Sequence, residues 1–134
     1  MFNLKSWLAL LAASATLSAA SVIPNTVAKR DISCTFVISP SITPDPSTNL
    51  ESELNWIFIR SLLDASPTGG PIHHAGSVIA SVSDDGKYTV TDSEITSTGF
   101  TDEEVAATVT GFQGTTVTGL TTPAIDWTYE SVVC

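Results

Sequence analysis

The chain has 134 residues, with 14 acidic and five basic side chains, and its formal net charge is −9 at pH 7. Three of the basic residues, Lys5, Lys29 and Arg30, lie within the first 30 positions, so residues 31–134 keep two basic against 14 acidic side chains, a net charge of −12. Nucleic acids and anionic membranes bind proteins through clustered lysine and arginine. We therefore expect neither as a partner, and two cysteines are too few for a structural zinc site.

Residues 1–20 have the features of a signal peptide. Lys5 precedes an apolar stretch over residues 7–17, and small side chains follow up to Ala20, where signal peptidase is expected to cut. This stretch is shorter than the roughly 20 apolar residues that a membrane-spanning helix needs. The protein is therefore expected to be soluble, secreted and extracellular.

Residues 21–30 are expected to form a propeptide. They end in Lys29 and Arg30, a pair that resembles the dibasic site of kexin-type processing proteases of the fungal secretory pathway. Cleavage there would leave one domain, residues 31–134, beginning at Asp31. The alternative is that the two basic residues are adjacent by chance.

Cys34 and Cys134 stand near the two ends of this domain. In an oxidising compartment two cysteines most simply pair with each other, and such a bond would join the ends of the domain. A disulfide between two copies of the chain, through either cysteine, is the alternative.

The first expected elements are a strand and a helix. Residues 34–38 are β-branched and aromatic, which predicts a strand. Over residues 49–64 the apolar side chains recur at helical spacing, and Thr48 with Glu51 has the pattern of a capping box at the helix start. The glycines and prolines of residues 64–76 predict a loop.

A hairpin and a second helix follow. Residues 78–83 and 87–95 flank an Asp-Asp-Gly turn, which predicts two strands joined by a tight connection. Thr101 and Glu104 form a second capping-box pattern, and the shorter helix behind it is expected to end near Gly111.

The last part of the chain completes the expected fold. Residues 113–123 are rich in threonine and glycine and indicate a loop or an irregular strand, and residues 125–130 alternate as a strand does. Because Cys134 falls out of this alternation, a bulge near Glu130 or a frayed end is expected. The order β-α-β-β-α-β predicts an α+β, ferredoxin-like sandwich, an antiparallel sheet with two helices on one face, in which the first and last strands are neighbours.

The sequence contains no pattern that identifies a reaction. His73 and His74 are the only histidines and are consecutive in a loop, so we expect both to be solvated. Serine-elbow, calcium-loop, phosphate-loop and dinucleotide patterns are all missing from the sequence. We interpret the chain as non-catalytic, with no cofactor or metal; an enzyme of unrecognised class is the alternative.

The first helix carries a second apolar stripe. At about 100° per residue, Trp56, Ile59 and Leu63 fall opposite the expected core face, which consists of Leu50, Leu54, Ile57, Phe58 and Leu62. Either the loop at 64–76 or the segment after Gly111 covers this stripe, or it is a surface for partner recognition or self-association.

Two segments resemble a known inhibitor family. The sequence GFTDEEVA beginning at Gly99 and the sequence IDWTYE beginning at Ile125 resemble the second half of subtilisin-propeptide-type inhibitors. This resemblance implies a βαββαβ fold and inhibition of serine proteases. That family inserts a free C-terminal tail into the protease, whereas this chain ends at Cys134.

The organisation of the whole chain is similar to small secreted proteins of mushroom-forming fungi, some described as immunomodulatory and others as effectors. The shared features are the signal peptide, the dibasic pair and the acidic domain with two cysteines. This resemblance implies a non-catalytic, immunomodulatory or effector-like protein with a protein partner. A serine protease inhibitor is the alternative function.

Overall fold

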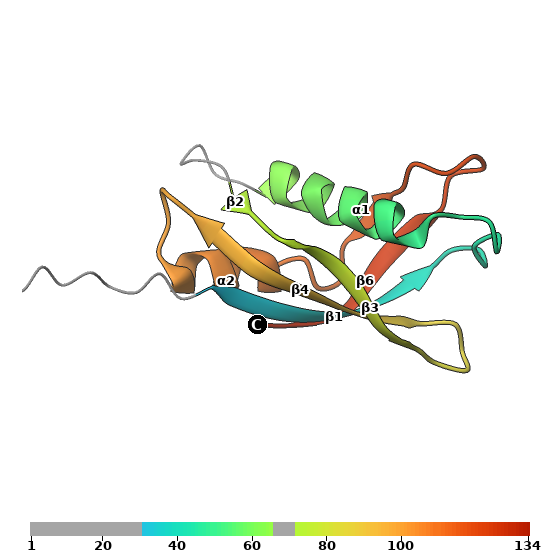
Figure 1. Cartoon of the computed structure of the whole chain (residues 1–134), viewed down its shortest axis with the longest axis horizontal. Coiled ribbons are helices and arrows are strands. Elements are labelled where there is room, and N and C mark those ends of the chain that lie inside the picture. Colours follow the sequence, from blue (N-terminus) through green and yellow to red (C-terminus); the bar gives the residue numbers. More distant parts are fainter. Residues whose placement is uncertain (1–30, 66–71) are drawn as a thin grey trace, which may run out of the picture.

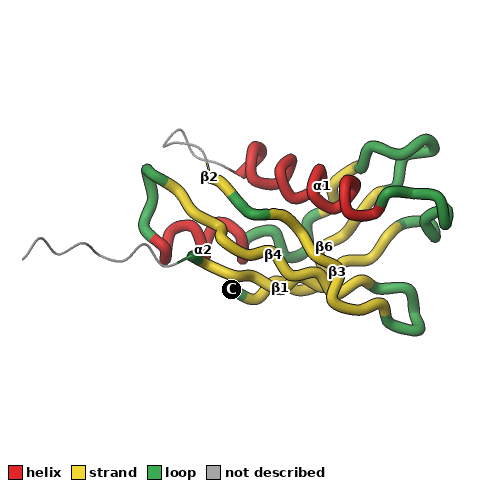
Figure 2. The backbone as a smooth tube through the Cα atoms, viewed as in Figure 1, coloured by secondary structure: helices red, strands yellow, loops and turns green. Residues whose placement is uncertain are grey.

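The computed structural model describes residues 31–65 and 72–134 (Figures 1 and 2). The expected signal peptide and propeptide, with Ala20, Lys29 and Arg30, lie outside the described residues. Within these two ranges the elements are β1 (Ile32–Pro40), α1 (Leu50–Ala65), β2 (Ile72–His73), β3 (Gly76–Val82), β4 (Tyr88–Ser97), α2 (Asp102–Thr110), β5 (Thr116–Thr118) and β6 (Asp126–Val133).

The strands form one antiparallel sheet in the order β2-β4-β1-β6-β5, with β3 also paired to β4. The fold is therefore α+β, as predicted, but the sheet has six strands in the described residues where four were expected. The two additional strands are short. β2 lies within the expected loop at 64–76, and β5 lies in the stretch predicted as loop or irregular strand. Strands of two or three residues leave no periodicity in a sequence and depend on a paired neighbour for their hydrogen bonds.

Both helices pack on one face of the sheet. The rings of Phe58 in α1 and Phe112 after α2 lie 6.0 Å apart, and both belong to the same buried cluster as the inward-facing residues of β1 and β6. Phe36 of β1 contacts Phe58 and Tyr129, with ring centroids 5.2 and 5.7 Å away. The expected core face of α1 is confirmed: Leu50 is partly buried, and the fully buried members are Leu54, Ile57, Phe58 and Leu62.

The two helices begin at capping residues. The side chain of Thr101 accepts a hydrogen bond from the Glu104 N–H, and Glu104 accepts one from the Thr101 N–H, which confirms the second capping box. The expectation for α1 was wrong. Asn49 Oδ1 accepts from the Ser52 N–H at 3.1 Å, whereas the N–H of Thr48 donates to the Asp45 carbonyl in the preceding turn. Helix α1 thus starts one residue later, because an asparagine oxygen caps it.

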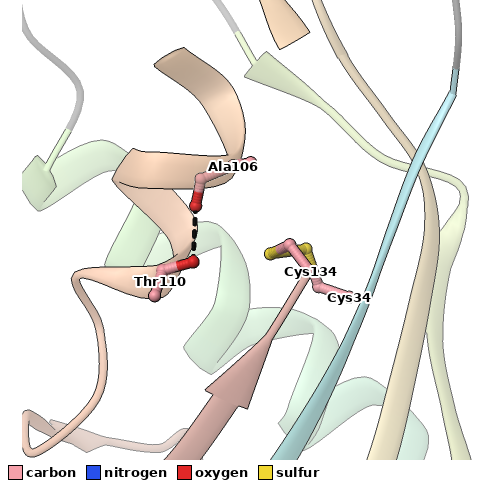
Figure 3. Close-up of a disulfide and its surroundings, with 4 residues drawn as sticks. All are labelled: Cys34, Ala106, Thr110 and Cys134. Carbon is pink, nitrogen blue, oxygen red and sulfur yellow. Dashed lines mark hydrogen bonds between the residues drawn. A yellow bond between two sulfur atoms is a disulfide. The ribbon is translucent and has the colours of Figure 1, made fainter. Parts of the chain in front are cut away.

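A bulge in β6 brings the two cysteines together. Val37 pairs with Ser131 and Ile38 with Tyr129, so Glu130 is the extra residue, as the alternation predicted. Cys34 and Cys134 form an intramolecular disulfide with their Cα atoms 4.0 Å apart. It joins the start of β1 to the end of the chain, beside α2 (Figures 1 and 3). The predicted pairing is confirmed.

Candidate functional site

Helix α1 forms hydrogen bonds with strands near both edges of the sheet. Asn55 Oδ1 accepts a hydrogen bond from the Ser77 N–H of β3 at 2.7 Å, and Glu53 Oε2 accepts one from the Leu120 N–H just after β5 at 2.9 Å. Positions two apart on a helix differ by about 200° in direction, so two side chains of one helix can serve opposite edges. The sheet therefore curls around α1. Two side chains of α1 accept hydrogen bonds from N–H groups that an edge strand would otherwise leave without a partner.

Glu53 is a buried carboxylate in this arrangement. Besides the Leu120 N–H, it accepts a hydrogen bond from Trp127 Nε1 at 3.1 Å, and it is 2% exposed. Gly119 lies directly against it, because a Cβ at that position would overlap Glu53 Oε1. Neither Glu53 nor Gly119 was predicted from the sequence. The available signal was that Glu53 stands four residues before Ile57, on the edge of the predicted core face.

A groove opens between α1 and β5 beyond this contact. One part has a volume of about 390 Å³ and is lined by Trp56, Arg60 and Asp64 of α1 and by residues 116–120. A second part of about 480 Å³ continues towards α2 and Phe112, and shares Asp64, Thr116 and Val117 with the first. Arg60 Nε and Asp64 Oδ2 are paired at 3.1 Å on the exposed rim.

Strand β5 lines this groove with its backbone. The Gly119 N–H donates to the Ile125 carbonyl, and the Thr115 carbonyl accepts from the Tyr129 N–H, so odd-numbered residues bond towards β6. The backbone groups of Thr116 and Thr118 point the opposite way by strand alternation. Their side chains turn to the other face of the sheet, where the hydroxyls contact Thr128 and Asp126. Since β5 is an edge strand, these backbone groups are not paired with another strand in the described part of the chain.

The three residues of the second apolar stripe are in different environments. Trp56 is partly buried and packs against the core from the groove wall. Ile59 and Leu63 are 39% and 67% exposed. The segment after Gly111 therefore covers Trp56, which agrees with one of the two alternatives for this stripe. It leaves Ile59 and Leu63 accessible. Residues 66–71 of the other candidate loop lie outside the described residues.

One histidine of the expected loop is not solvated as predicted. His73 is exposed, but the neighbouring His74 packs its ring 5.0 Å from that of Phe58 and places Nδ1 2.9 Å from Asp92 Oδ2. Asp92 is fully buried and also accepts a hydrogen bond from the Ser77 hydroxyl at 2.8 Å. A buried carboxylate is stable only when hydrogen-bond partners surround it. The contact with Asp92 therefore holds His74 against the sheet.

This cluster does not have the order of a nucleophilic triad. In a triad the histidine stands between the acid and the hydroxyl, and it accepts the hydroxyl proton. Here Ser77 and His74 both bond to the same carboxylate of Asp92. The arrangement ties β3, and the residue that follows β2, to β4. The sequence signal for Asp92 was its place in the predicted strand, in alternation with the inward-facing Tyr88 and Val90.

The pKa values of Tyr129, Asp45 and Asp85 are shifted from their usual ranges, each for an identifiable physical cause. Burial raises the pKa of Tyr129 well above its usual range, and the negative charge of Asp92 adds to this, while the nearby Ser61 hydroxyl opposes it. In the exposed turns, hydrogen bonds from Ser47 lower the pKa of Asp45, and the hydroxyl of Ser83 lowers the pKa of Asp85.

Across residues 31–65 and 72–134 no group of three or more histidine, cysteine, aspartate or glutamate side chains is arranged to hold a metal ion. No helix in those ranges is long and apolar enough to cross a membrane. Comparison of the chain with protein-family models, curated proteins and solved structures found no match.

Proposed function

We propose that this chain is a small, secreted, non-catalytic binding protein with an immunomodulatory or effector-like role, and that α1 carries its contact surface for a protein partner. The observation that carries this proposal is the apolar stripe of Trp56, Ile59 and Leu63. Leu63 and Ile59 are exposed on a helix whose opposite face is fully packed. Exposed apolar side chains next to a partly buried aromatic are typical of protein contact sites.

Secretion is supported by the disulfide. Bonds of this kind form in oxidising compartments and are rare in the cytosol, and here the bond joins residues 100 positions apart. The expected leader, with its cut after Ala20 and its dibasic pair at Lys29 and Arg30, agrees with export.

The ferredoxin-like assignment belongs to the same proposal. When the short strands β2 and β5 are set aside, the long strands follow the order β3-β4-β1-β6. This places the first and last long strands side by side with two helices on one face, as in the split βαβ arrangement. The two short strands are then additions at the edges of that core.

The alternative function, inhibition of subtilisin-like proteases, is less well supported. In that family the C-terminal segment enters the protease, whereas here the segment that follows β6 is held to β1 by the Cys34–Cys134 disulfide. Stoichiometric inhibition of a subtilisin-like protease by the secreted protein would favour this alternative over the proposal.

The proposal is tested with one pair of matched variants. Leu63 on α1 and Val78 on the open face of β3 are 67% and 65% exposed, so substitution of either by aspartate adds one charge to a similarly accessible position. We expect the secreted protein to induce cytokine release from mammalian blood mononuclear cells, L63D to lose most of this response, and V78D to keep it. Circular dichroism and urea unfolding establish that both variants are folded.

Two results would contradict the proposal. One is a wild-type protein that gives no cellular response, and the other is an equal response from L63D and the wild type. Sedimentation of the same proteins separates a partner surface from self-association, because a dimer held by α1 would dissociate in L63D alone.

A further inference from the structure

We propose that the groove between α1 and β5 binds an extended, basic peptide segment, which adds to the sheet as a strand beside β5. This inference rests on the proposed binding function and specifies the class of ligand and the mode of recognition. It concerns the backbone edge of β5, whereas the preceding proposal concerns the outer side of α1. Trp56 contributes to both, because it belongs to the stripe and also lines the groove.

Strand β5 has unused hydrogen-bonding capacity on its outer edge. Thr116 and Thr118 direct an N–H and a C=O each away from β6, which is the spacing that an added strand satisfies. The next edge donor, the Leu120 N–H, is already bonded to Glu53. The Glu53 side chain therefore occupies the edge position at Leu120, just after β5. The edge positions at Thr116 and Thr118, along the groove, remain available for hydrogen bonding.

The groove has enough space beside β5 for one additional strand. Neighbouring strands lie about 4.8 Å apart, so a ligand strand needs a space along β5 that one chain can fill. The groove supplies this space over two connected parts of about 390 and 480 Å³. Its opposite wall is helix α1, and addition of an extended peptide to an exposed sheet edge is a recurring mode of recognition.

The groove lining and the net charge of the protein indicate which side chains the ligand carries. In an added strand, alternate side chains point towards the helix side, where Trp56, Val117 and Phe112 present apolar surface. Arg60, the only basic residue that lines the described groove, is already paired with Asp64. With a net charge of −12 over residues 31–134, the protein attracts cationic ligands. The expected ligand therefore has apolar residues at alternate positions and carries lysine or arginine.

The edge strand β3, on the opposite side of the sheet, is less suitable for strand addition. In β3, the outward-pointing Ser77 N–H already donates a hydrogen bond to Asn55 Oδ1. A register shift between Ile79 and Ser81 also interrupts the regular pairing of β3 with β4. Such bulges discourage edge pairing. The open hydrogen-bonding groups and the groove coincide at β5.

The test uses a library of acetylated, amidated hexapeptides and the secreted protein. We expect it to select peptides with alternating apolar residues and a positive charge. The selected peptide should shift the backbone amide signals of Thr116 and Thr118 and slow their hydrogen exchange by about tenfold or more. N-methylation of the peptide amides that face β5 should weaken binding by about tenfold each, and N-methylation of the alternate amides should leave it unchanged.

Two variants of one residue provide the matched control. In T118P the edge-facing N–H is absent, which an edge strand tolerates, so the variant should lose peptide binding. In T118A the hydroxyl that contacts Asp126 is absent but the N–H is kept, so binding should persist. Should T118P fail to fold, the N-methylated peptides give the same information on the wild-type protein.

The proposal is overturned if no library peptide binds saturably below about 1 mM, if T118P binds as well as T118A, or if amide shifts fall outside the groove. These outcomes leave the partner surface on α1 untouched, because L63D is read in the cellular assay. Loss of the cellular response in L63D together with no peptide binding would retain the proposed function and reject this mode of recognition.

Discussion

Substitution of Gly119 by alanine should destabilise the protein far more than an ordinary glycine substitution. The new Cβ would lie 2.5 Å from Cδ of Glu53 and closer still to its Oε1, well inside any tolerated contact. The backbone of Gly119 is held by its hydrogen bond to the Ile125 carbonyl at 2.8 Å. The Glu53 carboxylate must therefore move, and it leaves Trp127 Nε1 and the Leu120 N–H without their acceptor.

The magnitude follows from those two hydrogen bonds. A hydrogen bond to a charged group contributes about 1.5 to 3 kcal/mol, and Trp127 is fully buried, so water does not replace the lost acceptor. We expect the free energy of unfolding to fall by about 3 to 5 kcal/mol. This is a large part of the roughly 5 to 15 kcal/mol that holds a domain folded.

A double-mutant cycle with urea unfolding, followed by tryptophan fluorescence, measures the effect. In the E53A background the carboxylate is gone, so G119A should change the free energy of unfolding by less than about 1 kcal/mol. The expected coupling is therefore about 3 kcal/mol. Gly86 is the control: it has a φ of 79°, and a Cβ added there would meet nothing within 4 Å, so G86A should cost about 1 kcal/mol in both backgrounds.

The destabilising contact between residue 119 and Glu53 is refuted if G119A is as stable as the wild type to within about 1 kcal/mol. It is also refuted if G119A costs the same with and without Glu53, because the contact between the two residues would then not be the cause.

Three further outcomes are expected. Replacing Cys34 and Cys134 by serine should lower the free energy of unfolding by about 4 to 5 kcal/mol, because the bond closes a loop with a sequence separation of 100; an unchanged urea midpoint would contradict this. Burial raises the folded-state pKa of Tyr129, so its contribution to stability is present below the unfolded pKa of about 10 and declines as the pH rises above it; Y129F should reduce this alkaline loss in urea titrations, and an unchanged loss would contradict this. T101A removes the side-chain cap of α2 and should cost about 1 kcal/mol by thermal unfolding; no loss would show that the cap is dispensable.

Local patterns in the sequence predicted much of the framework. The helical spacing of apolar residues identified α1 and its buried face, and the Thr101 and Glu104 pair identified the start of α2. The broken alternation before Cys134 identified the bulge at Glu130. These features depend on residues a few positions apart, or on a single pair of cysteines, and can be read without knowing what packs against them.

The candidate site was predicted only in part. The stripe of Trp56, Ile59 and Leu63 was recognised, but the groove beside it was not. The groove exists because β5, a strand of three residues, forms on β6 and faces α1. So short a strand has no pattern of its own, and its formation depends on the hydrogen bonds that β6 offers.

The amino-acid pattern by itself determined the α+β class, the helices and the long strands, and it favoured pairing of the two cysteines within one chain. Tertiary structure alone decided which polar residues would be buried and what they would bind. Glu53 meets the Leu120 N–H across 67 residues of sequence, and His74 meets Asp92 across 18. A buried carboxylate is stable only where donors converge on it, and that convergence exists only once the sheet has curled around α1.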